Sequence, residues 1–353
     1  MSYQVLARKW RPRTFQEMVG QEHVLRALIN ALDHQRLHHA YLFTGTRGVG
    51  KTTLARIFAK ALNCEQGVGS TPCGRCAVCS EVDQGRFVDL IEVDAASRTR
   101  VEDTRDLLDN VQYLPARGRT KVYLIDEVHM LSNSSFNALL KTLEEPPDYV
   151  KFLLATTDPQ RLPVTILSRC LQFNLKRITA ERIAAHVQMI LGRENIQFDE
   201  SAPALIAAHA DGSMRDALSL LDQAIAYGGG ALRDGDVRTM LGTVNREHVY
   251  DVARALAAGD GMAVLTAVQT IVESAVDFGQ VLDELMHLLH QIAVQHVAPG
   301  ARAVTATSMA DDPVAELAQR IAPEDVQLFY QIGALGKRDF ALPPDPRVPL
   351  EIP

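Results

Sequence analysis

A glycine-rich segment restricts the fold of this chain more than any other part of its sequence. It reads Gly45-Thr46-Arg47-Gly48-Val49-Gly50-Lys51-Thr52 and fits the phosphate-loop pattern G-x4-GK[ST]. An apolar run, residues 40–43, precedes it, and a helical pattern over residues 51–62 follows. Glycines let the backbone curl so that its N–H groups point inward, at the start of a helix whose dipole favours negative charge. The segment therefore predicts a strand–loop–helix unit that binds phosphate groups.

The side chains of this loop suit a nucleoside triphosphate that carries a magnesium ion. We expect Lys51 to reach the β- and γ-phosphates and the Thr52 hydroxyl to hold Mg²⁺. The residues expected to contact the nucleotide are Gly45, Thr46, Arg47, Gly48, Val49, Gly50, Lys51, Thr52 and Thr53. A glycine-rich turn between a strand and a helix, without a ligand, is the alternative interpretation.

An acidic pair, Asp126 and Glu127, follows the strongly apolar residues 122–125. This pattern predicts a buried central strand with the acids at its C-terminal end, where ligands bind in open α/β sheets. We expect Asp126 to bind Mg²⁺, directly or through water, and Glu127 to polarise the attacking water. A surface position for Glu127 at the start of a loop is the alternative. Together with the phosphate loop, the pair predicts an enzyme that hydrolyses ATP.

Five strand-like segments alternate with helical patterns in the first half of the chain. They are residues 40–43, 89–93, 121–126, 152–156 and 171–174. Such alternation predicts an α/β fold, with a mostly parallel sheet that has helices on both faces. From about residue 179 the strand signals stop. The helical patterns that follow cover residues 180–191, 202–210, 213–227, 246–257, 261–274, 278–296 and 323–337.

Four of the five cysteines form a C-x8-C-x2-C-x2-C pattern at Cys64, Cys73, Cys76 and Cys79. Two adjacent C-x2-C steps suit tetrahedral thiolate ligation of structural Zn²⁺, with no open position left for catalysis. Disulfides are the weaker alternative in a reducing cytosol. Cys170 stands alone in the sequence and is expected to be a half-buried small side chain.

Bulk properties limit the kinds of partner. The formal net charge is −7, so any contact with nucleic acid must be local. Basic residues near the N-terminus are not followed by an apolar signal segment, and no run of about 18 apolar residues occurs. We therefore expect no membrane span and a cytoplasmic location.

With these motifs the chain resembles the gamma/tau family of bacterial DNA polymerase III, the ATPase subunits of the replicative clamp loader, among the AAA+ proteins. The resemblance covers nearly the whole chain. The residues that carry it are 3–12, 19–21, the phosphate loop, the four cysteines, the Asp126-Glu127 strand and Leu167-Ser168-Arg169-Cys170. It implies a nucleotide-binding domain (1–178) with a zinc module (64–79), a helical lid domain (179–242) and a helical collar domain for oligomerisation (243–353).

The resemblance also implies roles for single residues. Arg169 matches a finger that reaches the γ-phosphate held by the neighbouring subunit. Pairing with an acid in its own chain is the alternative for Arg169. Thr157 matches the polar sensor beside the γ-phosphate, with Thr156 as the competing choice. Arg215 matches the lid arginine that reads the γ-phosphate, and a salt bridge at the helix start is its alternative.

Three further residues are implied at the adenine pocket: Val19 and Gly20 line it, and Arg11 lies near it. The family forms five-subunit rings that load a sliding clamp onto primed DNA. The candidate DNA contacts are Arg98, Arg100 and Arg105, although a solvated helix face would look similar. The family closes its collar with another apolar helix, whereas residues 342–353 here contain five prolines.

The sequence thus predicts an ATPase motor subunit of the clamp loader within the DNA polymerase III holoenzyme. Two other functions remain open. One is a nucleotide-gated scaffold that hydrolyses ATP negligibly, against which an intact Glu127 and Arg169 argue. The other is an ATP-driven DNA helicase, for which we identify no strand-separating motif.

Overall fold

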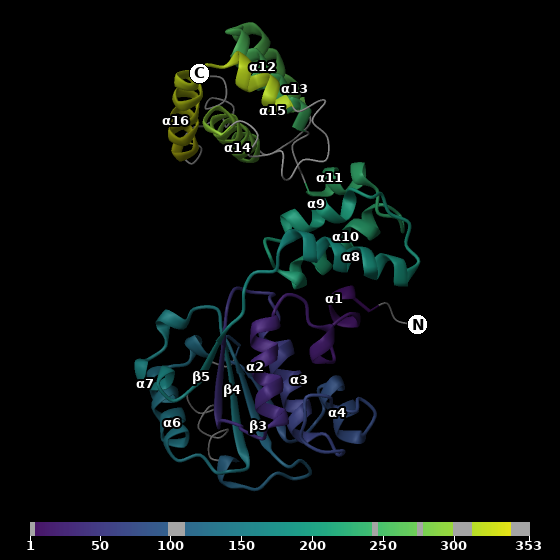
Figure 1. Ribbon diagram of the computed structural model, residues 1–353, viewed down its shortest axis with the longest axis vertical. Coiled ribbons are helices and arrows are strands. Elements are labelled where there is room, and N and C mark those ends of the chain that lie inside the picture. The colour runs from purple at the N-terminus through teal and green to yellow at the C-terminus, as the bar shows by residue number, and fades with distance from the viewer. Residues whose placement is uncertain (1–3, 98–109, 242–245, 274–277, 299–312, 340–353) are drawn as a thin grey trace. The chain divides into compact units, whose positions relative to one another are not determined.

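The computed structural model describes residues 4–97, 110–241, 246–273, 278–298 and 313–339 (Figure 1). The chain forms two compact units, residues 1–233 and 234–353. The first holds the sheet and the helices that follow it, and the second is helical. No helix in the described ranges is both long enough and apolar enough to cross a membrane.

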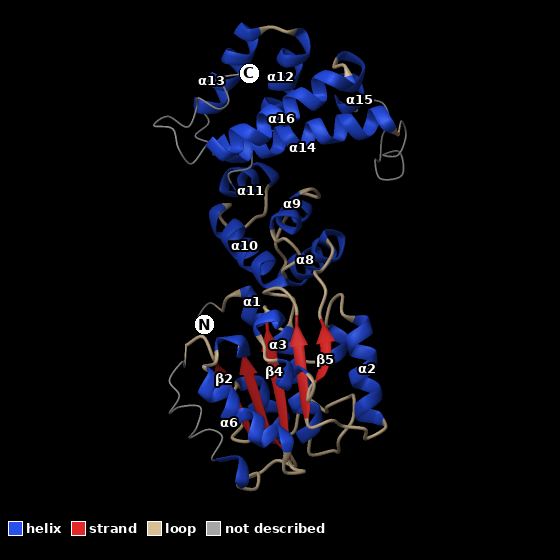
Figure 2. Ribbon diagram, turned by 90° about the vertical axis from the view of Figure 1, so that its left-hand side faces the viewer, coloured by secondary structure: helices blue, strands red, loops and turns tan. Residues whose placement is uncertain are grey.

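Five parallel strands form the sheet of the first unit, in the order β2-β3-β4-β1-β5 (Figure 2). The strands are β1 (Ala40–Thr44), β2 (Leu90–Asp94), β3 (Lys121–Asp126), β4 (Val150–Thr156) and β5 (Leu171–Asn174). All five segments predicted from the sequence are strands, with ends that differ by at most two residues. The α/β fold class is confirmed.

Helices lie on both sides of the sheet (Figure 1), and alternate residues of β1 belong to different cores. Tyr41 and Phe43 of β1 pack into a core with the helices α2 (Glu22–Asp33) and α3 (Lys51–Asn63). Ala40 and Leu42 face the opposite core, with α6 (Asn133–Glu144) and α7 (Val164–Leu167). Because both faces are buried, the strands are apolar along their whole length rather than on alternate residues.

The strand order brings the chemically important loops to one edge of the sheet. Thr44 at the end of β1 is in register with Thr156 at the end of β4, and β3 ends beside β4. β1 lies between β4 and β5; the chain passes from β1 to β2 at one edge of the sheet, and later from β4 to β5 on the other side of β1. The carboxyl ends of strands at such a crossover form the usual ligand crevice of open α/β sheets.

Three helices follow the sheet within the first unit: α8 (Ala180–Glu194), α9 (Ala202–His209) and α10 (Met214–Tyr227). The short N-terminal helix α1 (Leu6–Lys9) packs against α10, where the Leu6 N–H donates to Asp222 at 2.7 Å. Glu194 at the end of α8 accepts from Lys9 at 2.6 Å and from Trp10 at 2.8 Å. The N-terminal segment is thereby tied to two of these helices.

The second unit is a helical bundle with its own apolar core. Buried residues of α12, α13, α14, α15 and α16 form that core. The helices are α11 (Asp234–Leu241), α12 (Arg246–Ala258), α13 (Gly261–Glu273), α14 (Phe278–Val297), α15 (Pro313–Arg320) and α16 (Pro323–Asp339).

Several elements were not predicted. They are α1, α2, α4 (Ala77–Gln84), α7, α11, α15 and the short 3₁₀ turns Phe15–Glu17, Asn110–Gln112, Val128–Met130 and Pro159–Arg161. Most are too short for a clear helical period. The exception is α2, which buries Val24, Leu28 and Leu32 on one face, a spacing that the sequence shows plainly.

Candidate nucleotide and metal sites

The phosphate loop joins the end of β1 to the start of α3, as its sequence predicts. No side chain caps the first turn of α3, so its backbone N–H groups are available at the helix start. Gly48 has a φ of +78°, and a Cβ added to it would lie 1.8 Å from Ser213 Oγ. Ser213 is the N-cap of α10, which places the lid helix directly against the loop. Such a nest of N–H groups suits the oxygens of a polyphosphate.

Lys51 is folded onto the loop that precedes it. Its ammonium group donates to the carbonyls of Gly45 at 2.8 Å and Thr46 at 3.0 Å. Burial lowers the pKa of Lys51, and the nearby carboxylates of Glu127 and Asp126 partly offset that effect. A desolvated cation within reach of two carboxylates is suited to binding the anionic end of a nucleotide.

Thr52 and Asp126 meet across the end of the sheet. The Thr52 hydroxyl donates to Asp126 Oδ2 at 2.6 Å. These two oxygens are hard ligands of the kind that Mg²⁺ takes together with water and phosphate oxygens. The donor set therefore fits a nucleotide-bound Mg²⁺.

Glu127 lies at a sharp turn after β3. Its φ is +48°, a left-handed conformation that costs a non-glycine residue about 1–3 kcal/mol and occurs often at functional sites. Glu127 Oε2 accepts from the Thr157 N–H at 3.1 Å and the Thr157 hydroxyl at 2.9 Å. The Thr156 hydroxyl instead contacts His129 at 2.9 Å and accepts from the Asp158 N–H at 3.0 Å. Of the two threonines, only Thr157 touches the acid expected to act on water.

A cavity of about 470 Å³ joins the phosphate loop, the acidic pair and the lid helices. Its lining includes the expected residues Arg11, Val19, Arg47, Gly48, Val49, Gly50, Lys51, Thr52, Thr53, Asp126, Glu127 and Arg215. Gly20, Gly45, Thr46, Thr157 and Arg169 are not part of the lining. The volume falls within the range of small-molecule sites.

Arg11 and Arg215 bring positive charge to this cavity from outside the loop. Arg11 Nε donates to the Thr53 hydroxyl at 3.0 Å. Burial lowers the pKa of Arg11 to about 10, with the charge of Arg56 as the next contribution. Arg215 begins the lid helix α10, and no carboxylate among the described residues pairs with it. A salt bridge at the helix start therefore does not account for Arg215 here.

The apolar wall of the cavity is formed by residues that no sequence motif predicts. Val5, Ala7, Ile178, Met214 and Leu218 line it, together with His186 of α8. They come from three distant segments and carry no motif, so no local signal could have identified them. Burial lowers the pKa of His186, which favours its neutral form beside a ligand.

Arg169 lies away from this cavity, just after α7. Its guanidinium donates to the Thr165 carbonyl at 2.8 Å and to Glu144 Oε1, at the end of α6, at 2.7 Å. Within one chain Arg169 therefore pairs with an acid and does not reach the nucleotide site of the same chain. Both residues of the pair are partly exposed.

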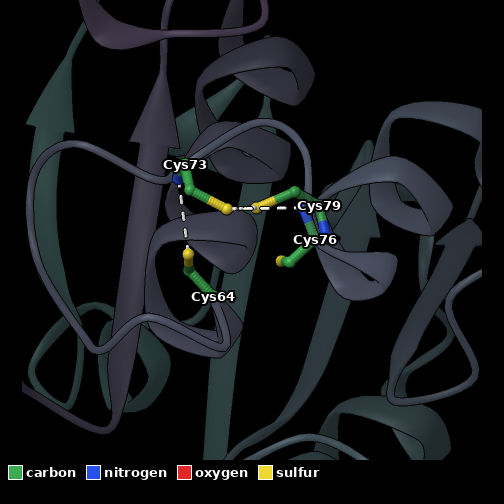
Figure 3. A group of neighbouring side chains, drawn as sticks. All are labelled: Cys64, Cys73, Cys76 and Cys79. Atoms are coloured by element: carbon green, nitrogen blue, oxygen red, sulfur yellow. Dashed lines mark hydrogen bonds between the residues drawn. The ribbon is translucent and has the colours of Figure 1, made fainter.

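The four motif cysteines converge on one point (Figure 3). Their Sγ atoms all lie within 4.8 Å of one another, and those of Cys73 and Cys79 are 3.9 Å apart. Tetrahedral Zn–S bonds of about 2.3 Å give sulfur–sulfur separations of about 3.8 Å, whereas a disulfide requires about 2.05 Å. The cluster thus fits a zinc ion better than a disulfide.

Backbone N–H groups surround these sulfurs as they do in metal–thiolate sites. The backbone N–H groups of Cys73, Cys76 and Cys79 each donate to the Sγ atom of the cysteine before it in the motif, at N–S distances of 3.3–3.4 Å. Hydrogen bonds from the backbone of Arg75 and Cys76 lower the pKa of Cys73 to about 6, and burial raises that of Cys79. Cys170 is buried rather than half-buried, and burial raises its pKa to about 12.

The expected DNA contacts, Arg98, Arg100 and Arg105, lie outside the described residues.

Comparison with solved structures supports the architecture. The Thermotoga maritima RuvB Holliday junction branch migration motor matches with a TM-score of 0.50 at 21% identity, over 70% of this chain and 79% of that chain. At this identity the likeness concerns the fold alone. The parallel sheet, the phosphate loop after β1, the acidic pair after β3 and the helical lid define a P-loop ATPase fold of the AAA+ class.

Family models cover most of the chain in three consecutive parts. They are DNA polymerase III, delta subunit (20–179), DNA polymerase III clamp loader subunit, ATPase lid domain (182–230), and DNA polymerase III subunits gamma and tau domain III (232–353). DNA polymerase III subunit gamma of Buchnera aphidicola subsp. Baizongia pistaciae is 44% identical over all of this chain and 96% of its own length. The chain belongs to the DNA polymerase III gamma/tau family.

The tau subunit of Escherichia coli K12 is 56% identical over 100% of this chain. The chain spans 55% of that relative and 50% of the tau/gamma subunit of Haemophilus influenzae, which is 55% identical. It thus spans about half the length of these longer relatives.

Proposed function

We propose that this chain is an ATPase motor subunit of a bacterial replicative clamp loader, acting within the DNA polymerase III holoenzyme. The observation that carries the proposal is the convergence of Lys51, Thr52, Asp126 and Glu127 on one cavity that the lid residue Arg215 also lines. Membership of the gamma/tau family supports the same assignment.

In this proposal the loop N–H groups and Lys51 bind the β- and γ-phosphates of ATP. Thr52 and Asp126 hold Mg²⁺, which would neutralise charge on the phosphate oxygens. Glu127 orients and polarises the attacking water, and Thr157 fixes the Glu127 carboxylate by two hydrogen bonds. Arg215 reports the γ-phosphate to the lid because it begins a lid helix.

Arg169 acts in trans in this proposal. It leaves Glu144 or shares it, and reaches the γ-phosphate bound by the neighbouring subunit of a five-membered ring. A guanidinium on the transition-state charge accelerates phosphoryl transfer by about 10³–10⁵. Because the neighbour supplies it, hydrolysis would depend on assembly, and the ATP-bound ring would open the sliding clamp and release it closed on primed DNA.

The remaining metal site is structural in this proposal. All four cysteine sulfurs would be ligands of Zn²⁺, so no position is open for a substrate. The ion would hold residues 64–79 as a folded module that joins the C-terminal end of α3 to the first turn of α4.

Steady-state ATP turnover of the chain, assembled with its partner subunits, sliding clamp and primed DNA, tests the proposal. We expect Glu127→Gln to bind ATP as tightly as the wild type but to lose at least about 10²-fold in turnover, since it removes the group that acts on water. Glu200→Gln, an exposed acid elsewhere in the same unit, serves as the matched control and should leave turnover unchanged. Negligible turnover by the wild-type assembly would instead support the nucleotide-gated scaffold.

A further inference from the structure

A second cavity, of about 480 Å³, adjoins the nucleotide cavity. Five arginines from three separate segments line it: Arg8, Arg11 and Arg13 near the N-terminus, Arg56 of α3, and Arg86 after α4. The two cavities share Arg8, Arg11, Pro12 and Thr53. The family resemblance predicted only Arg11, as a neighbour of the adenine.

The arginines that line this second cavity outnumber its acidic lining residues. Its one acidic lining residue, Asp83, already pairs with Lys60 at 2.6 Å. Arg56 pairs with Glu92. None of the other four guanidinium groups pairs with a carboxylate in the described part of the chain: Arg11 donates to a hydroxyl and Arg86 to the Gln84 amide oxygen, while Arg13 donates to Glu17 Oε2 at 2.6 Å through its backbone N–H only. In a chain of net charge −7, this concentration of cations is a local feature.

Clustered guanidinium groups are matched to one ligand chemistry above others. Their planar N–H forks bind phosphate oxygens in pairs, and a bound anion relieves their mutual repulsion. The cavity has the volume of a small-molecule site, whereas contacts to a nucleic-acid backbone follow an extended basic track. We propose that this cavity binds a small phosphate-bearing anion of about the size of pyrophosphate, at the same time as a nucleotide occupies the neighbouring cavity.

Arg11 gives the two sites a physical connection. It is half-buried between them and contacts Thr53, next to the threonine expected to bind magnesium. Besides burial, the charges of Arg56 and Arg215 lower the pKa of Arg11, and those of Glu92 and Asp126 partly offset them. An anion in the second cavity would offset the repulsion among these cations. Bound anion should therefore change nucleotide affinity, and nucleotide should change anion affinity by the same factor.

Isothermal titration calorimetry with pyrophosphate on the full chain tests the proposal. Because pyrophosphate also suits a phosphate loop, the titration is made with the nucleotide cavity saturated by a non-hydrolysable ATP analogue, and again in a Lys51→Ala background. We expect one pyrophosphate site in both cases. The double variant Arg13→Gln/Arg86→Gln, which changes only residues outside the nucleotide cavity, should weaken this site at least about tenfold, the effect of one lost charge-assisted hydrogen bond.

Arg36→Gln, an exposed arginine on the same unit, is the matched control and should bind pyrophosphate as the wild type does. An unchanged melting temperature of the double variant shows that any loss is not due to unfolding.

The proposal is overturned if neither titration shows a pyrophosphate site, or if the double variant binds as tightly as the wild type. It is also overturned if a short single-stranded DNA binds in an Arg13- and Arg86-dependent way while pyrophosphate does not. If the wild-type chain does not bind the ATP analogue while the Lys51→Ala variant still binds one pyrophosphate, the result contradicts the proposed function and leaves the second site in place.

Discussion

At the scale of single residues, the site depends on side chains that are held in place before any ligand arrives. Lys51 is bonded to two carbonyls of its own loop, and Glu127 is bonded to Thr157. These contacts fix the direction of each group, so little conformational entropy would be lost when a nucleotide binds.

Lys51→Ala should lower ATP affinity at least about a hundredfold. The change removes the charge-assisted hydrogen bonds to the β- and γ-phosphates, and each is worth more than a neutral one. Titration with a fluorescent ATP analogue measures the loss. Lys141→Ala, an exposed lysine on α6, should leave affinity unchanged, and normal ATP affinity of the Lys51→Ala variant would remove the phosphate-loop assignment.

Gly48→Ala should impair both the loop and its contact with the lid. At φ +78° an alanine is strained by about 1–3 kcal/mol, and its Cβ would collide with Ser213. We expect a lower melting temperature and weaker nucleotide binding, measured by thermal unfolding with and without ATP. Gly192→Ala, which lies inside α8 with no atom within 4 Å of its new Cβ, should be neutral or slightly stabilising. Equal behaviour of the two variants would contradict the close packing of loop and lid.

At the scale of elements, the cysteine module is the part whose stability depends most on a ligand. Residues 64–76 connect α3 to α4 through a glycine-rich loop, and at Gly67, Gly69 and Gly74 an added Cβ would meet no atom within 4 Å. Val68 and Cys76 pack against the core and Ser70 bonds to Asp33, but the space around the glycines is open. We therefore expect metal ligation to supply a large share of the folding free energy of this loop.

Elemental analysis of the purified chain should find one zinc per chain. Cys73→Ser should lose the metal and lower the melting temperature, because it removes one of four ligands. Cys170→Ala should keep full zinc content, since that residue is buried in the core against the opposite face of the sheet. A wild-type chain without zinc, or a Cys73→Ser variant with normal content, would refute the site.

At the scale of the whole molecule, the position of Arg169 has the largest consequence. It is remote from the nucleotide cavity of its own chain and partly exposed beside Glu144. A single chain therefore has the groups for binding ATP but lacks this cation at the γ-phosphate.

Arg169→Ala should leave ATP binding intact and reduce turnover of the assembled complex by about 10³–10⁵-fold. Arg161→Ala, at an exposed arginine that pairs with its neighbour Asp158, is the matched control. Turnover per chain should also rise with assembly as protein concentration increases. If the isolated chain hydrolyses ATP as fast as the complex, Arg169 does not act in trans.

The sequence by itself determined the elements that repeat a local pattern. Buried parallel strands are continuous apolar runs, the phosphate loop is contiguous, and the cysteines lie within a short segment, so each could be predicted from neighbouring residues. Tertiary structure alone decided which distant groups meet: the apolar wall around His186, the hydrogen bonds between Thr157 and Glu127, the pairing of Arg169 with Glu144, and the arginine-lined cavity. Those contacts join residues that are far apart along the chain. The order of the strands and the position of the lid helices bring these residues together in space, and neither can be deduced from the sequence around each residue.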